Sequence, residues 1–268
     1  MRHVLILTLC VCAVPAFAEQ IGPDALADLR ADVVILGEVH DNPVHHAHQA
    51  QAVTALAPAA LVFEMLTPEQ AAAVTDANRG DAAALGAALD WEASGWPDFT
   101  MYHPIFTAAP EAKIYGAALP RDEVRRSVTE GAAVILGADA ERFGLTSPLP
   151  AAEQAAREAD QMAAHCNAMP AEMMPGMVEA QRLRDASLAR AAVQATAETG
   201  GPVAVIAGSG HARRDWGIPA ALALAAPELS VLSVGQIEAE GDVEPGQPFD
   251  VWLVTEPTPR EDPCAAFN

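Results

Sequence analysis

Residues 33–43, VVILGEVHDNP, decide the fold class, because a strand pattern and a helix start follow each other directly. Residues 33–37 are branched apolar residues ending in glycine, which predicts a strand buried on both faces. Asp41 or Asn42 can cap a following helix, and Pro43 suits its first turn. We therefore expect a buried strand that leads into a helix, the repeating unit of an α/β sheet.

The same strand pattern recurs along the chain. Short apolar runs occur at residues 60–65, 112–119, 202–208, 229–235 and 250–255. Alanine-rich segments of helical composition separate most of these runs. This alternation predicts an α/β fold with a largely parallel central sheet covered by helices.

Two segments need separate interpretation. The long helical region around 151–200 is interrupted by Pro170 and Pro175, so we expect it to be inserted as a helical hairpin or arm. The segment WPDFTMYHPIF, residues 96–106, is aromatic and contains two prolines. We expect it to be a structured connection packed on the domain.

The N-terminal stretch MRHVLILTLCVCAVPAFA has the pattern of a secretory signal peptide. Its apolar run is too short for a membrane helix, which needs about 20 apolar residues. We expect a cleavable signal peptide over residues 1–18 and a single domain over residues 19–268. Cys10 and Cys12 raise the alternative of a lipid-anchored cysteine, which the large residues before them disfavour.

The chain is strongly acidic, with 15 Lys and Arg against 36 Asp and Glu and a formal net charge of −21. A field of this sign repels nucleic acid and anionic membranes, so we expect no nucleic-acid partner. The acidity favours solubility and does not by itself identify a metal carrier.

Two cysteines, Cys166 and Cys264, lie beyond the signal segment. An exported compartment favours a disulfide between them, which would join the C-terminal tail to the middle of the chain. The alternative is that Cys166 stays a thiolate and acts with its neighbours.

Two Gly-x-x-His patterns follow apolar runs, at residues 37–40 (GEVH) and 208–211 (GSGH). Open α/β sheets bind ligands at the carboxyl ends of their strands, where both patterns are expected. Glu38 and His40 are two positions apart, so an extended backbone points both side chains the same way. Glu64 closes another apolar run and needs a partner, because burying a lone carboxylate is costly.

Glu38, His40, Glu64 and His211 therefore have two interpretations. They could bind Zn²⁺, Mn²⁺ or Fe²⁺ with one open position, and Glu38 and Glu64 would then serve a metal-dependent hydrolase. Alternatively, the four side chains hydrogen-bond one another and the loop backbone.

The helix after the first strand carries further histidines. His45 and Gln49 share a helix face, and His46 lies beside Gln49. We expect these three residues to support the pocket, whereas His48 is expected to be solvated.

Four stretches resemble the ChaN family of haem-binding uptake proteins, within the Tiki, TraB and erythromycin-esterase-like superfamily: LGEVHDNPVHHAHQ, VFEM, AQRLRDASLA and IAGSGHARRDWGIP. The similarity runs from about Asp32 to Thr255. It implies an α/β domain with a helical excursion, export to the periplasm or outer membrane, and haem binding linked to iron uptake through an outer-membrane haem transport system. Many members carry a lipid anchor, whereas this signal segment has a cleavable pattern.

The resemblance leaves catalysis open. Superfamily relatives of the Tiki type are metal-dependent proteases built on two Gly-x-x-His motifs and a glutamate. That pattern falls here on His40, His211 and either Glu64 or Glu38. The haem-binding interpretation is preferred, with a hydrolase as the alternative.

Haem ligands are not fixed by the shared motifs. A tyrosine is a plausible axial ligand in this family, and Tyr102 is the better candidate because Tyr115 lies in a predicted strand. The Met-rich stretch at residues 162–177 provides other donors, namely His165, Met169, Met173 and Met177.

The Met-rich stretch has three interpretations. Its Met and His side chains suit haem iron, and clustered Met with Cys or His suits Cu(I). The alternative is that the methionines fill an irregular apolar surface or form a homodimer contact through the helical arm.

Haem propionates require cations. Arg182, Arg184 and Arg213 are the candidates best placed by sequence. Arg182 and Asp185 could instead form a salt bridge on the helix surface.

Overall fold

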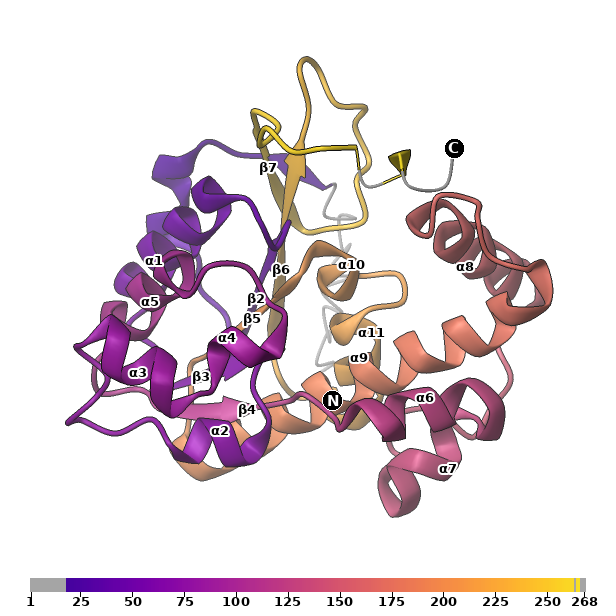
Figure 1. The fold of residues 1–268 in the computed structure, drawn as a ribbon, viewed down its shortest axis with the longest axis horizontal. Coiled ribbons are helices and arrows are strands. Elements are labelled where there is room, and N and C mark those ends of the chain that lie inside the picture. The colour runs from indigo at the N-terminus through magenta and orange to yellow at the C-terminus, as the bar shows by residue number, and fades with distance from the viewer. Residues whose placement is uncertain (1–17, 263, 266–268) are drawn as a thin grey trace, which may run out of the picture.

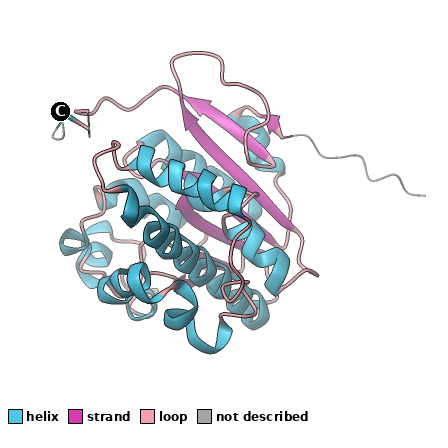
Figure 2. Ribbon diagram, turned by 90° about the vertical axis from the view of Figure 1, so that its right-hand side faces the viewer, coloured by secondary structure: helices cyan, strands magenta, loops and turns pink. Residues whose placement is uncertain are grey.

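A computed structural model describes residues 18–262, 264 and 265. The expected signal peptide therefore lies almost wholly outside the described residues. Figure 1 shows a central sheet with helices on both sides, and Figure 2 shows helices packed over the sheet.

The sheet has seven strands in the order β1-β7-β6-β2-β5-β3-β4, and each neighbouring pair runs parallel. The strands are β1 (Glu19–Gln20), β2 (Val33–Glu38), β3 (Ala60–Phe63), β4 (Lys113–Gly116), β5 (Val203–Gly208), β6 (Val231–Glu238) and β7 (Val251–Thr255). Six of them coincide with the predicted apolar runs, so the predicted α/β class and parallel sheet are confirmed. The additional strand, β1, is a short edge strand.

The helices fill the connections between strands. They are α1 (Pro43–Leu56), α2 (Pro68–Ala72), α3 (Ala82–Ala88), α4 (Trp91–Ser94), α5 (Phe99–Ala108), α6 (Arg121–Glu130), α7 (Ala132–Leu136), α8 (Ala151–Ala164), α9 (Met174–Thr199), α10 (Ser209–Ala212) and α11 (Ile218–Ala225). Short 3₁₀ turns occur at η1 (Pro23–Asp28), η2 (Gly137–Asp139) and η3 (Ala171–Met173). Among the described helices, none combines the length and apolarity needed to cross a membrane.

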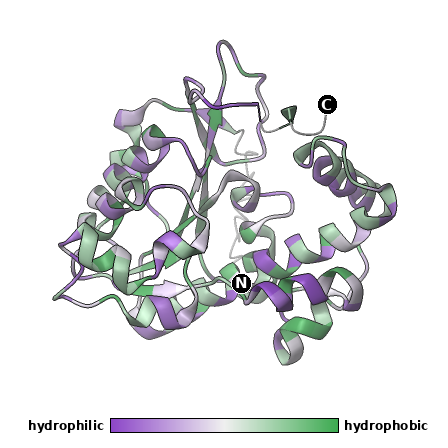
Figure 3. Ribbon diagram, in the orientation of Figure 1, coloured by the Kyte–Doolittle hydropathy of each residue, from purple (hydrophilic) through white to green (hydrophobic). Residues whose placement is uncertain are grey.

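The sheet has an apolar core on each face. Val33 and Ile35 of β2 pack with residues of α9 and α11, whereas Val34 and Leu36 pack with residues of α1 and α5. Successive side chains of a strand point to opposite faces, so a strand buried on both sides must be apolar throughout. Figure 3 shows apolar residues along the strands and polar residues on outer helices such as α6 and α8.

The start of α1 agrees with the sequence prediction. The Asn42 side chain accepts hydrogen bonds from the N–H groups of Val44 and His45, and Pro43 occupies the first turn. This cap satisfies N–H groups that have no partner within the helix. The helix direction is thereby fixed immediately after the motif at residues 37–40.

The segment at residues 96–106, expected to be a connection, forms most of helix α5 despite Pro104. Phe99, Tyr102 and Phe106 follow the i, i+3, i+7 spacing of one helix face, and all three are buried. Asp98 caps the helix by accepting a hydrogen bond from Thr100 N–H. Burial of this aromatic face outweighs the helix-breaking tendency of one proline.

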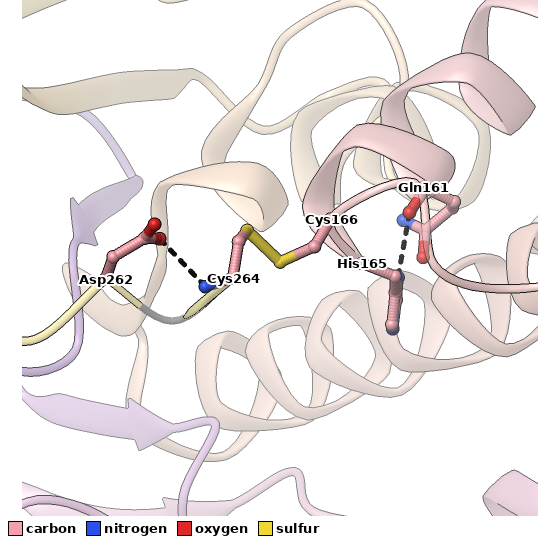
Figure 4. Close-up of a disulfide and its surroundings, with 5 residues drawn as sticks. All are labelled: Gln161, His165, Cys166, Asp262 and Cys264. Atoms are coloured by element: carbon pink, nitrogen blue, oxygen red, sulfur yellow. Dashed lines mark hydrogen bonds between the residues drawn. A yellow bond between two sulfur atoms is a disulfide. The ribbon is translucent and has the colours of Figure 1, made fainter. Parts of the chain in front are cut away.

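Helices α8 and α9 form the expected helical hairpin, with Pro175 in the first turn of α9. The expected disulfide between Cys166 and Cys264 is present and links residues 98 positions apart (Figure 4). It ties the connection between α8 and α9 to the C-terminal segment that follows β7. The alternative of a free Cys166 thiolate is therefore wrong.

Candidate functional site

The strand order brings the two Gly-x-x-His motifs together. β5 lies between β2 and β3, with Glu38 paired to Gly208 across the ladder. Glu64 directly follows β3, and its N–H donates to the Ile206 carbonyl of β5. Residues far apart in the sequence thus meet at the carboxyl edge of three adjacent strands.

Glu38 is the centre of one half of the site. Its Oε1 lies 2.8 Å from His40 Nδ1 and accepts a 2.9 Å hydrogen bond from the Tyr102 hydroxyl. Its Oε2 lies 3.3 Å from His46 Nδ1. Although burial opposes ionisation, the contacts with His40 and His46 lower the pKa of Glu38 to about 2.

Glu64 and His211 form the other half. Glu64 Oε1 lies 3.4 Å from His211 Nε2, and Oε2 accepts a 2.8 Å hydrogen bond from Gly208 N–H. His211 Nδ1 lies 2.6 Å from Oδ1 of the buried Asp185 on α9. Burial opposes the imidazolium form, but Glu64 and Asp185 raise the pKa of His211 to about 10. His211 is therefore a cation held between two carboxylates.

The four candidate residues are thus connected through hydrogen bonds and ion pairs. Glu64 Oε2 lies 4.0 Å from His40 Nε2, which places Glu64 between the two histidines. Within the part of the chain that the structure describes, no group of three or more His, Cys, Asp or Glu residues is arranged to hold a metal ion. The geometry matches the hydrogen-bonding interpretation, and the Zn²⁺, Mn²⁺ or Fe²⁺ interpretation gains no support.

A cleft with a volume of about 720 Å³ opens over this cluster. His40, Glu64, Gly208 and His211 lie at its floor, and the Trp96 ring is centred 4.8 Å from the His40 ring. The walls come from the α4 region, the connection after β4, α6 and α9. Wall residues include Met65, Ala93, Leu119, Arg121, Val124, Gln181, Arg184 and Leu188.

His45, His46 and Gln49 are buried behind the cleft. His45 Nδ1 accepts a hydrogen bond from Val39 N–H, and His46 Nε2 lies 2.9 Å from the His40 carbonyl. Burial lowers the pKa of His45 to about 4, so this side chain is neutral. These three residues fix the loop that carries His40, as a supporting role requires.

The position of His48 differs from the predicted one. It is half-buried, and its Nδ1 lies 2.8 Å from Oε1 of Gln236 on β6. The expectation of a solvated side chain was wrong, because β6 presents a polar residue to this turn of α1.

The sequence profile described as "Haem-binding uptake, Tiki superfamily, ChaN" matches residues 26–222. The chain belongs to this family. Among solved structures, "Cofacial heme binding to ChaN of Campylobacter jejuni" has 23% identity and a TM-score of 0.65, covering 85% of this chain and 89% of that one. The type III effector HopBA1 has 13% identity and a TM-score of 0.47, covering 91% and 99%. No curated protein matches the chain.

For this ChaN family member, the structure rejects Tyr102 as an exposed haem ligand. The side chain is 0% exposed, and its hydroxyl donates to Glu38. Burial and the neighbouring Glu38 charge raise the pKa of Tyr102, which opposes the phenolate form needed for iron ligation. Tyr115 is a core residue as expected, and its hydroxyl donates to Glu198.

The Met-rich stretch lies on the hairpin, away from the cleft floor. His165 Nδ1 lies 2.8 Å from the Gln161 carbonyl beside the disulfide (Figure 4). Met173 is 39% exposed, while Met169 and Met177 are half-buried. None of these four residues lines the cleft. This arrangement adds no support for copper binding by the Met-rich stretch.

The three arginines predicted to bind haem propionates differ in burial and in their partners. Arg182 is buried and donates to Glu179 and two backbone carbonyls, so it is a structural residue and not a propionate ligand. It does not pair with Asp185, whose partner is His211. Arg213 donates to Asp215 and lies 3.8 Å over the Trp216 ring. Only Arg184 of the three lines the cleft, where it is exposed.

Sequence reasoning missed two residues of the site. Asp185 entered the sequence analysis only in the alternative that it forms a surface salt bridge with Arg182, but α9 places it against His211. Arg121, at the start of α6, lines the cleft and donates to the Ser94 carbonyl. Neither contact has a local sequence signal, because both depend on how helices pack across the sheet.

Proposed function

We propose that this protein is a periplasmic haem-binding protein that acts in haem and iron uptake, and that it binds haem in the cleft over β2, β5 and β3. The observation that carries this proposal is the cleft itself. Its volume of about 720 Å³ lies within the range of roughly 300–1,000 Å³ typical of ligand pockets.

The cleft walls suit the chemistry of haem. Trp96, Leu119 and Leu188 provide apolar surface for a flat macrocycle. Arg121 and Arg184 lie on the walls, where guanidinium groups can pair with propionate carboxylates. Two cations in one cleft are notable in a chain with a net charge of −21. Iron in the bound haem would supply the coordination chemistry.

Export is supported by two observations. Residues 1–18 have the composition of a signal peptide, and the Cys166–Cys264 disulfide is typical of an oxidising compartment. We further propose an outer-membrane haem transport system as partner and homodimer contacts through the α8–α9 hairpin, where Met173 is exposed.

A hemin titration tests haem binding. Purified protein at micromolar concentration should give a shifted Soret band that saturates at a fixed ratio of hemin to protein. Absence of a saturable shifted band would contradict the proposal.

A variant of Arg184 tests whether haem binds in the cleft. Arg184→Ala should weaken hemin binding by up to about fivefold, because an exposed charge pair contributes about 0.2–1 kcal/mol. Arg190→Ala removes the same charge from the same helix outside the cleft and should leave affinity unchanged. Equal effects of the two variants would mean that haem lies elsewhere.

A further inference from the structure

We propose that a second cleft, formed between α8, α9 and α11, binds a small organic cation, a protonated amine or amidinium on an apolar body. This second cleft has a volume of about 330 Å³. None of its lining residues also lines the larger cleft proposed for haem. Its volume is less than half that of the haem cleft, so its ligand is smaller than haem. The inference therefore goes beyond the proposed function.

Helix α9 separates the two clefts. Arg184 and Leu188, four positions apart, line the haem cleft, whereas Arg182 and Asp185, three positions apart, line the second cleft. Residues three or four apart share a helix face, so each cleft uses its own face of α9.

The carboxylate of Asp185 lacks one hydrogen-bond partner. The residue is 3% exposed, and its Oδ1 lies 2.6 Å from His211 Nδ1. Its Oδ2 is buried, and no donor among the described residues lies within hydrogen-bond distance of it. Buried acceptors are nearly always paired, because leaving one without a donor is costly. Since Asp185 lines the second cleft, a donor bound there can reach this carboxylate.

The cations around the second cleft already have partners. Arg157 is buried on α8 and donates through Nε and Nη2 to Glu153. Arg182 donates to Glu179 and to two backbone carbonyls. Neither arginine hydrogen-bonds Asp185 Oδ2. The group left for a ligand is therefore a carboxylate oxygen, which favours a cationic donor.

Apolar side chains form the rest of the second cleft. Phe143, Leu145, Leu149, Trp216 and Leu224 lie on its walls. Leu224 is 64% exposed, and Leu149 and Trp216 are half-buried. Apolar walls around a few fixed polar groups are typical of small-molecule sites. An apolar body on the ligand would cover these walls while its charged end contacts Asp185.

Other occupants fit less well. A metal ion lacks ligands, because no group of three or more His, Cys, Asp or Glu within the described part of the chain is arranged to hold one. An organic anion would place its charge near Asp185, Glu153 and Asp215. The second cleft thus favours an organic cation.

The test uses benzamidine, a flat amidinium with an aromatic ring, as the probe in calorimetric titrations of the purified protein. The wild type should bind one benzamidine with a Kd of about 1 mM or tighter, as small ligands can reach. Benzamide has the same shape without the charge and should bind at least about tenfold more weakly, because hydrogen bonds between charged groups are the stronger ones. The His211 imidazole resonance should shift on binding, since Asp185 contacts both.

Two pairs of variants locate the site. Asp185→Asn should weaken benzamidine binding at least about tenfold, whereas Asp139→Asn removes a carboxylate outside both clefts and should have no effect. Ala220→Phe keeps Asp185 but fills the second cleft from α11, and should abolish binding. Ala223→Phe makes the same change at an exposed position of α11 outside the cleft and should bind normally.

Three results would overturn the inference. The first is the absence of saturable benzamidine binding to the wild type. The second is tighter binding of benzoate than of benzamidine, which would mean that Arg157 and Arg182 govern the second cleft. The third is unchanged benzamidine binding by Ala220→Phe, which would place the ligand elsewhere. None of these results bears on the hemin titration, because the two clefts share no lining residue.

Discussion

His211 lies between Glu64 and Asp185, and this pairing determines its charge. The two carboxylates raise the pKa of His211 to about 10 against the effect of burial. Burial raises the pKa of Asp185, whereas His211, His40 and the Gly208 N–H lower the pKa of Glu64 to about 2 against the effect of burial. Residue-scale electrostatics of this kind depend on three separate elements meeting at one point.

Glu64→Gln should therefore lower the pKa of His211. A pKa raised from 6.5 to about 10 stabilises the fold fully below pH 6.5, and this stabilisation is lost as the pH rises through 10. The wild type should lose stability between pH 7 and 10, and Glu64→Gln should lose less over the same range. Urea unfolding at each pH and an NMR titration of the imidazole measure these effects.

A matched control is Glu69→Gln, which removes an exposed carboxylate five positions away. It should leave the pKa of His211 and the pH profile unchanged. Identical His211 titrations in the wild type and Glu64→Gln would show that Glu64 does not hold the imidazolium.

The sequence predicted which polar residues lie at the strand ends, but it did not predict which side chains they contact. Glu38, His40, Glu64 and His211 were predicted to lie together from their strand-end positions, and the structure brings them together, because the carboxyl ends of parallel strands share one edge. Tyr102 was predicted to be a haem ligand, whereas the structure buries it. The prediction failed because the burial depends on helix α5 forming despite Pro104. Side-chain contacts across a sheet leave no local pattern in the sequence.

At the scale of elements, strands were predicted more reliably than helices. Each central strand is buried on both faces, which forces an uninterrupted apolar run. Helix α5 was missed because proline and aromatic residues also occur in connections. The α8–α9 hairpin was predicted from two prolines, and Pro175 lies in the first turn of α9, where its missing N–H does no harm.

The disulfide connects this hairpin to the C-terminal segment, and its removal should destabilise the protein. Cross-linking residues 98 positions apart restricts the unfolded chain, and loops of about 100 residues give stabilisation near 4.7 kcal/mol in the chain-entropy treatment. Replacing Cys166 and Cys264 together by Ser should lower the free energy of unfolding by about 2–4 kcal/mol in urea titrations.

Reductant provides the control for this effect. Dithiothreitol should destabilise the wild type to a similar degree and leave the double variant unaffected. A double variant as stable as the oxidised wild type would show that the hairpin needs no covalent support.

At the scale of the whole molecule, the sheet order assembles the site. β5, which carries one Gly-x-x-His motif, lies between β2, which carries the other, and β3, which is followed by Glu64; α9, packed on one face of the sheet, adds Asp185 and Arg184. Sequence patterns predicted a parallel sheet but not this order. Strand order follows from packing and connection handedness over the whole chain, which short motifs do not encode.

The net charge of −21 creates a conflict between long-range and local electrostatics. Hemin approaches with two propionates, so the overall field repels it, while Arg121 and Arg184 attract it within the cleft. Screening acts mainly on the long-range part, because the Debye length falls from about 30 Å at 0.01 M salt to about 10 Å at 0.1 M.

Stopped-flow absorbance should therefore show hemin associating several-fold faster at the higher salt concentration. Hemin dimethyl ester, which lacks the carboxylate charges, should show little salt dependence. A slower association of hemin at high salt would mean that the cleft arginines dominate the approach as well as the bound state.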